Sequence, residues 1–333
     1  MSYINYDTKK LSTARTTIMG FAMMMVVFFH SSLNIESFWP YQTIKNSGDI
    51  AVDIFFFVAG IGIFYSLNKH SSKKEYIIKR LLRILPAYLI VDGLWFVLQD
   101  IILSQGDFTN FILDVTSLNF WINGRPTTWY LSALLLLQLL TPFYKKASEK
   151  YSKLKWIVIL GLFAIGLTIR LTPFLDDLFD HLLIIIFRAP CYFIGFEFGK
   201  MVHNGENIKI NKAVISIVPI ISILVILTAY GIFKIYIPWS FKYIAYCPLA
   251  IILSILLSNV KEDRLTNFFG KNSLEIYLIH EKVLWAVSII ADKLLPTNIL
   301  VNITVNIVSV LIACIAANIL HKLISLAIKK RGK

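Results

Sequence analysis

Long apolar runs recur along almost the whole chain, and polar residues gather in the short segments between them. An α-helix needs roughly 20 predominantly apolar residues to cross a bilayer. The polar faces that helices of a soluble protein show at regular spacing are mostly missing from these runs. The pattern predicts about ten membrane-spanning helices, near residues 16–34, 50–68, 82–103, 127–143, 155–172, 181–200, 213–233, 240–259, 271–291 and 299–325.

The composition agrees with a membrane protein, because 57% of the residues are hydrophobic, against about 45–50% in a typical soluble domain. We find no convincing internal repeat and no low-complexity linker between the apolar runs. We therefore expect an all-α polytopic membrane protein, in which residues 1–333 form a single helical bundle without an additional soluble domain.

The net charge of +13 is distributed unevenly along the chain. Lysine and arginine concentrate before the first predicted span, after the second and fourth spans, and at the C-terminus. This positive-inside pattern predicts a multi-pass protein of the plasma membrane with both termini in the cytoplasm. The first helix lacks a small-residue cleavage site after His30, so we expect it to be retained. Since topology explains the charge, we expect no nucleic-acid partner.

The three cysteines, Cys191, Cys247 and Cys314, fall in three different predicted spans. They have no paired spacing of the kind that disulfide frameworks or metal sites show. We interpret them as small packing residues within apolar helices, and we expect no metal site.

Two titratable residues stand at the ends of successive apolar runs, since His30 closes the first and Asp53 opens the second. Ionisable groups are costly in a bilayer and often functional there. Imidazole suits a general base because its unperturbed pKa is about 6.5, and a carboxylate can orient it. If the two helices pack antiparallel, these ends are neighbours, and we predict His30 and Asp53 as catalytic residues. The alternatives are a structural interface histidine and a solvated carboxylate at a helix start.

Three further polar residues lie within apolar runs. Arg188 must face an acid or a cavity, because an arginine in mid-span costs roughly 2.5–3.5 kcal/mol. Tyr277 and His280 are three residues apart and so share a helix face. We predict all three as substrate-binding residues. The alternatives are a structural ion pair for Arg188 and a buried, hydrogen-bonded histidine for His280.

Five segments in this order together resemble the acyltransferase-3 family of integral-membrane O-acyltransferases. They are Val26-Val27-Phe28-Phe29-His30, Val52-Asp53-Ile54-Phe55-Phe56-Phe57-Val58-Ala59-Gly60, Lys79-Arg80-Leu81-Leu82-Arg83-Ile84-Leu85-Pro86, Trp129-Tyr130-Leu131-Ser132, and the run from Phe269 to His280. Each segment alone is weak evidence, because apolar helices look alike. Their order and their distribution over most of the chain make the set specific.

The resemblance implies an enzyme that moves an acetyl or other short acyl group from acyl-CoA to a hydroxyl of a bacterial surface glycan or lipid-linked saccharide. It implies that His30 is the essential catalytic residue. Trp129 and Tyr130 match a family segment, and we expect them to bind the substrate.

The resemblance also implies a donor site. Arg80 and Arg83, with Lys79, would bind the phosphates of acetyl-CoA, or another short acyl-CoA, by charge-assisted hydrogen bonds. The family's first-helix arginine is Met19 here, and Arg15, one helical turn earlier on the same face, is the residue that could take its place. The alternative for these basic residues is anchoring against anionic membrane lipid.

Other functions remain open at this stage. A transporter or flippase for a glycan precursor would use buried His30, Asp53 and Arg188 for coupling, and a non-catalytic membrane partner would tolerate the loss of His30. If the donor phosphates bind at the cytoplasmic face and His30 lies in the outer half, a pantetheine arm must thread the bundle. An acyl relay on the protein is the alternative.

Overall fold

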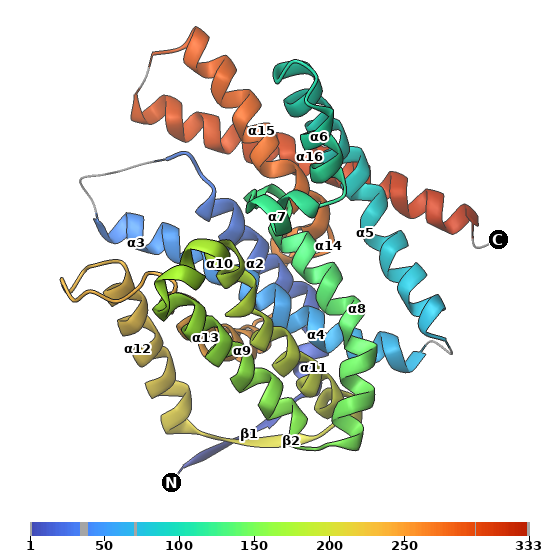
Figure 1. The fold of residues 1–333 in the computed structure, drawn as a ribbon, viewed down its shortest axis with the longest axis vertical. Helices are drawn as coiled ribbons and strands as arrows, with labels where there is room; N and C mark the ends of the chain where they lie inside the picture. The colour runs from blue at the N-terminus through green and yellow to red at the C-terminus, as the bar shows by residue number, and fades with distance from the viewer. Residues whose placement is uncertain (1, 34–38, 70–71, 297, 332–333) are drawn as a thin grey trace. The chain divides into compact units, whose positions relative to one another are not determined.

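The computed structural model describes residues 2–33, 39–69, 72–296 and 298–331, and these are helical apart from loops and one small sheet (Figure 1). Residue 34, the last of the first predicted span, lies outside the described residues. Strands β1 (Tyr3–Asp7) and β2 (Asn207–Asn211) pair antiparallel, with Tyr3 opposite Asn211. This sheet is an exception to the predicted all-α fold. It pairs the backbone groups of two segments that are too short and polar to form spans.

Apolar helices occupy the positions of all ten predicted spans. Among the described residues, six are long and apolar enough to cross a membrane: Pro40–Lys69, Lys74–Leu103, Leu154–Leu171, Pro173–Asn204, Lys212–Ala229 and Ile299–Ile328. Two shorter apolar helices cover Arg15–Phe29 and Phe241–Leu257. The remaining two predicted spans coincide with helices Trp129–Lys150 and Ser273–Leu294. The helical prediction is therefore confirmed, whereas the number of helices that cross the membrane remains a prediction.

Contacts divide the chain into two compact units. Unit 1 comprises Met1–Ile18, Ile50–Ile77 and Asn119–Glu262, and unit 2 comprises Met19–Asp49, Ile78–Leu118 and Asp263–Lys333. Each unit combines segments that are distant in the sequence. The prediction of one domain over the whole chain is not tested by this division.

Unit 1 is built around α4 (Ala51–Lys69) and α11 (Ala189–Asn204), which pack against each other. Glycines permit this contact. A Cβ at Gly195 would lie 2.1 Å from the carbonyl oxygen of Phe57, and a Cβ at Gly60 would lie 2.2 Å from the carbonyl oxygen of Tyr192. Small residues serve this purpose wherever membrane helices approach closely. Besides the two strands, unit 1 contains α1 (Lys9–Thr13), most of α7 (Leu118–Asn123), η3 (Pro126–Thr128), α8 (Trp129–Lys150), α9 (Leu154–Leu171), α10 (Pro173–Ile186), α12 (Lys212–Ala229) and α13 (Phe241–Leu257).

Unit 2 contains most of α2 (Arg15–Phe29) and of α5 (Lys73–Phe96), with the pair α15 (Ser273–Leu294) and α16 (Ile299–Arg331). The packing of α15 against α16 includes a contact of 2.9 Å between Glu275 Oε1 and His321 Nδ1. Asp263 caps the start of α14 (Arg264–Lys271) by accepting hydrogen bonds from two backbone N–H groups, as acidic N-cap residues commonly do. The other elements are α3 (Trp39–Ser47), the π-helical segment η2 (Val97–Leu103) and α6 (Phe108–Val115).

Candidate active site

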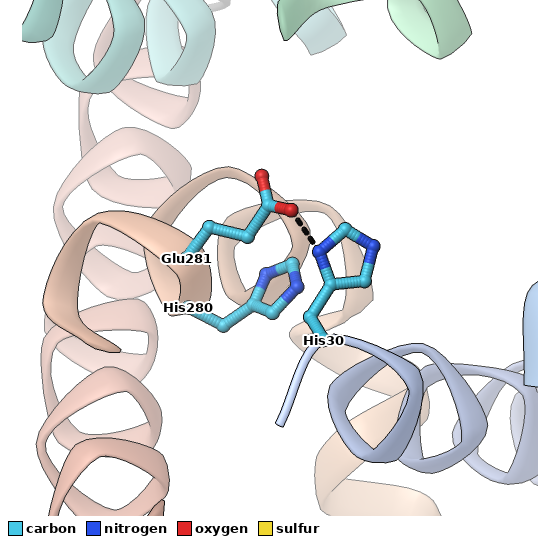
Figure 2. A group of neighbouring side chains, drawn as sticks. All are labelled: His30, His280 and Glu281. Carbon is cyan, nitrogen blue, oxygen red and sulfur yellow. Dashed lines mark ion pairs between the residues drawn. The ribbon is translucent and has the colours of Figure 1, made fainter. Parts of the chain in front are cut away.

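His30 lies directly after the last residue of α2 and faces a carboxylate. Its backbone N–H donates to the Val26 carbonyl, so the last helical turn holds its position. Its Nδ1 forms an ion pair with Oε1 of Glu281 on α15 (Figure 2). The two side chains are 27% and 49% exposed, so this pair is open to its surroundings.

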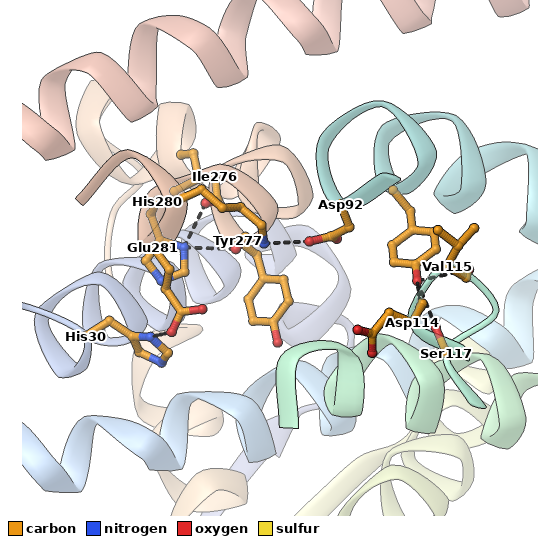
Figure 3. Close-up of polar contacts among 11 residues, drawn as sticks. His30, Asp92, Asp114, Val115, Ser117, Ile276, Tyr277, His280 and Glu281 are labelled. Atoms are coloured by element: carbon orange, nitrogen blue, oxygen red, sulfur yellow. Dashed lines mark hydrogen bonds and ion pairs between the residues drawn. The ribbon is translucent and has the colours of Figure 1, made fainter. Parts of the chain in front are cut away.

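His280, the neighbour of Glu281 on α15, places a second imidazole beside the first. The ring centroids of His30 and His280 are 5.0 Å apart. His280 is only 5% exposed, and its Nδ1 lies 2.9 Å from the carbonyl oxygens of Ile276 and Tyr277 (Figure 3). Since a carbonyl only accepts, Nδ1 carries the hydrogen, and Nε2 of the neutral ring is left with a lone pair. Within the described part of the chain, Nε2 has no hydrogen-bond partner.

The predicted pairing of Tyr277 with His280 on one helix face is confirmed, since their ring centroids are 6.1 Å apart. One residue beyond Glu281, the Lys282 ammonium forms an ion pair of 2.5 Å with Asp92 of α5. This stretch of α15 therefore brings four polar side chains into unit 2, at a helix that the sequence shows as largely apolar.

Unit 1 holds a second polar centre, the ion pair between Asp53 on α4 and Arg188 (Figure 1 shows the two helices). Nη1 of Arg188 lies 3.0 Å from Oδ2 of Asp53, and both side chains are 0% exposed. Arg188 is the N-cap residue of α11, in the break after α10, and Pro190 is the second residue of the new helix, since proline is tolerated in the first turn. Of the two predicted surroundings of Arg188, an acid or a cavity, the structure shows the acid. Its role in substrate binding remains a prediction.

Aromatic rings surround the Arg188 guanidinium. Its carbon atom lies 5.4 Å from the ring centroid of Trp129, 4.5 Å from that of Tyr243 and 5.6 Å from that of Tyr246. These are cation–π distances. Tyr130 packs its ring 5.2 Å from that of Phe56 on α4. Trp129 and Tyr130, both predicted as substrate-binding, therefore lie in the aromatic surroundings of α4 and the ion pair.

A cavity of about 140 Å³ adjoins this aromatic cage in unit 1. Trp129 and Tyr243 contribute to its wall on the side of Arg188, and Trp239 and Phe120 add further rings. Its polar lining residues include Asp180, which binds Arg170 at 3.0 Å, and His181. The volume far exceeds the roughly 10–15 Å³ that one water needs, so the cavity can hold a small organic group.

The two predicted catalytic residues belong to different units, His30 to unit 2 and Asp53 to unit 1. The carboxylate that pairs with His30 is Glu281, whereas the Asp53 carboxylate pairs with Arg188. The hypothesis that Asp53 orients the His30 imidazole remains a prediction.

The predicted donor-binding residues also fall into two groups. Lys79, Arg80 and Arg83 lie in the first turns of α5, and residues 78 onward belong to unit 2. Arg15 belongs to unit 1, where its Nη2 lies 3.7 Å from the position of a Cβ built on Gly62 of α4. Donor binding by these residues remains a prediction.

Sequence reasoning missed Glu281, Trp239 and Tyr243. For Glu281 there was a usable signal, because this charged residue stands beside His280 in a largely apolar helix. No comparable signal marks Trp239 and Tyr243, because aromatic residues are common in apolar helices and at their ends. All three cysteines are free thiols, and Cys191 and Cys247 are buried. Their role as small packing residues remains a prediction.

Apolar helices of spanning length, with titratable groups held between them, define a multi-pass membrane protein. A family model described as an acyltransferase domain, that of the acyltransferase-3 family, matches residues 18–320, nearly the whole chain. The chain belongs to the acyltransferase-3 family and is a membrane acyltransferase. No curated protein and no solved structure matches it.

Proposed function

We propose that this membrane acyltransferase moves an acetyl or other short acyl group from acyl-CoA in the cytoplasm to a hydroxyl of an extracytoplasmic glycan or lipid-linked saccharide. About ten spanning helices in the plasma membrane, with both termini cytoplasmic, would place the donor and acceptor on opposite sides. The distribution of lysine and arginine supports this topology.

The observation that carries the proposal is the pair of His30 and Glu281. Because Nδ1 of His30 faces a carboxylate, it carries the hydrogen in the neutral ring, and Nε2 keeps the lone pair. Glu281 then holds the imidazole in one tautomer and stabilises its protonated form, as the acid of a catalytic triad does. Nε2 is thereby suited to act as a general base.

The proposed reaction is balanced with this one base. Nε2 of His30 removes the proton from the acceptor hydroxyl, and the oxygen attacks the thioester carbonyl of acyl-CoA. The tetrahedral intermediate breaks its C–S bond, and the coenzyme A thiolate leaves with the proton from the imidazolium. The products are the glycan ester and free coenzyme A, and the histidine returns to its neutral form.

For the donor, Lys79, Arg80 and Arg83 supply positive charge at the start of α5 that suits the phosphates of coenzyme A. The pantetheine arm would thread the bundle toward His30, and an acyl relay on the protein is the alternative route. Arg15 is the candidate for the position of the family's first-helix arginine.

Within unit 1, the cavity offers Trp129, Trp239 and Tyr243 in its lining as a surface for a saccharide. Aromatic faces pack against the apolar C–H faces of sugar rings, and Asp180 and His181 offer hydrogen bonds to hydroxyls. This combination of flat apolar walls with a few polar groups is typical of small-molecule sites. It supports a sugar as the acceptor.

The test measures ester-linked acyl groups on surface glycans of cells that carry the wild-type protein, no protein or His30→Ala. Mild alkali releases the acids, and mass spectrometry identifies them, while immunoblots compare the amounts in the membrane. We expect the esters to disappear in the null cells and in the well-expressed His30→Ala cells. Esters that persist in the null cells refute the proposal in that host.

A transporter is the competing function, and the buried Asp53–Arg188 pair is the observation that favours it, since coupling groups in transporters are buried and ionisable. The same cells separate the two functions. A transporter defect reduces the amount of surface glycan itself, whereas an acyltransferase defect leaves its amount unchanged and removes only its esters.

A further inference from the structure

Three groups that ligate transition metals converge in unit 2. They are the imidazoles of His30 and His280 and the carboxylate of Glu281, and one ligand atom of each lies within 4.8 Å of the others (Figure 2). We propose that these three side chains bind one divalent transition-metal ion of the Zn²⁺ class, and that the bound ion blocks the catalytic histidine.

The chemistry of the three groups suits such an ion. Zn²⁺ accepts imidazole nitrogen and carboxylate oxygen at about 2.0–2.2 Å, and two histidines with one glutamate form a known three-ligand set that leaves the fourth position to water. Bonds of this length in a tetrahedron place ligand atoms roughly 3.4 Å apart. The ligand atoms now lie within 4.8 Å of one another, and the atoms of His30 and Glu281 that form the ion pair are already closer than this spacing. Side-chain shifts on the order of 1 Å would therefore bring the three groups to the required separations.

His280 is already prepared as a ligand. Its Nδ1–H donates to the carbonyls of Ile276 and Tyr277, which is the outer contact that metal-bound histidines usually make. This contact fixes the tautomer in which Nε2 carries a lone pair. That atom is buried and accepts no hydrogen bond from the described residues, so a cation would satisfy it.

The local charge also favours a cation. Glu281 and Asp49 carry negative charge near His30, and the positive charge of Lys45 compensates only one of them. The positive charge of Lys282 is compensated by its ion pair with Asp92. His30 and Glu281 are partly exposed, and this gives the ion a way in.

Occupation of the site would change the state of His30. A metal on Nδ1 takes the position of the hydrogen there, and the neutral ring then carries its hydrogen on Nε2. Nε2 can then no longer accept a proton from a hydroxyl. The Glu281 carboxylate binds the metal and no longer pairs with the imidazole. The metal-bound form is therefore unable to act through His30, a consequence that rests on the proposed function, whereas the binding itself does not.

The first test measures binding alone. Full-length, tag-free protein in detergent micelles is stripped with EDTA, dialysed against Zn²⁺ and analysed for metal content by mass spectrometry. Co²⁺ serves as a spectroscopic probe, because its visible absorption reports a tetrahedral site of nitrogen and oxygen ligands. We expect one ion per chain, with an affinity that falls at least about 10–100-fold in Glu281→Gln and in His280→Ala.

The matched control is His321→Ala. His321 also pairs with a glutamate, but it is not part of the three-residue cluster, so its loss should leave binding unchanged. Equal metal content in the wild-type protein and Glu281→Gln overturns the proposal, and Glu281→Gln suffices because this exposed side chain is not needed for packing. Inhibition of acyl transfer by Zn²⁺ is measured separately, so an absent transferase activity does not affect the binding result.

Discussion

The substitutions Asp53→Asn and Arg188→Met each remove one charge from the ion pair between α4 and α11. Both side chains are fully buried, and their charged atoms are 3.0 Å apart. Coulomb's law gives an attraction of about 5–6 kcal/mol at this distance with an effective dielectric constant of about 20. Three aromatic rings around the guanidinium add roughly 0.5–2 kcal/mol each. These contributions offset the cost of burying the two charges.

Breaking a buried pair by removing one partner destabilises a protein by about 3–5 kcal/mol, because the other charge stays buried. Replacing both partners by apolar residues of similar size is often neutral. We therefore expect each single variant to lose about 3–5 kcal/mol of unfolding free energy. The double variant Asp53→Leu/Arg188→Met should recover most of this loss.

The assay is reversible unfolding of the purified protein in mixed detergent micelles with increasing dodecyl sulfate, followed by tryptophan fluorescence. The matched control is Arg170→Met, because Arg170 pairs with Asp176 and the half-exposed Asp180. Arg170 is 16% exposed and its two partners are 27% and 55% exposed, so solvent screens this pair more than the fully buried one, and its loss should cost less than the loss of Asp53. The reasoning is refuted if Asp53→Asn is as stable as Arg170→Met, or if the double variant is less stable than either single variant. A stable double variant that lacks transferase activity would assign the pair to function.

Three further predictions concern the site and the packing. Glu281→Gln should lower kcat for acyl transfer on the order of 100-fold and change its pH profile, while KM for acyl-CoA stays unchanged. The control is Glu262→Gln, at an exposed residue. Identical pH profiles of Glu281→Gln and the wild-type protein would contradict a positioning role. Gly195→Ala should cost about 1–3 kcal/mol, because the new methyl group meets a backbone carbonyl at 2.1 Å, whereas Gly161→Ala, with nothing within 4 Å, should gain about 0.5–1 kcal/mol; equal stabilities by micelle unfolding would disprove this. Arg83→Ala should raise KM for acyl-CoA several-fold and weaken its salt dependence, and an unchanged KM would leave it a lipid anchor.

The membrane class and the positions of the helices could be predicted from the sequence, because apolar runs report directly on the surroundings of a helix. The need of Arg188 for an acidic partner was predictable for the same reason. Its identity was not, because Asp53 is 135 residues away in the sequence. The choice among the acids depends on which helices pack together, and the glycines that bring α4 to α11 do not announce their partners.

The candidate site illustrates the same limit. His30 and His280 were each recognised as polar residues in apolar surroundings, but their proximity depends on how the end of α2 meets α15. Local spacing predicted that Tyr277 and His280 share a face, since one helix fixes that relation. Glu281 could not be assigned to His30, because the sequence contains no information on rotation of α15 relative to α2.

The contact between α4 and α11 has a mechanical consequence. With no side chain between the two backbones at Gly60 and Gly195, neither helix can slide or roll without driving main-chain atoms into each other, and close-packed interiors resist this. The two helices therefore form one rigid unit that preserves the geometry of the ion pair between Asp53 and Arg188. Helix α12, of which 11% is buried, is the element of unit 1 that packing restrains less than this pair.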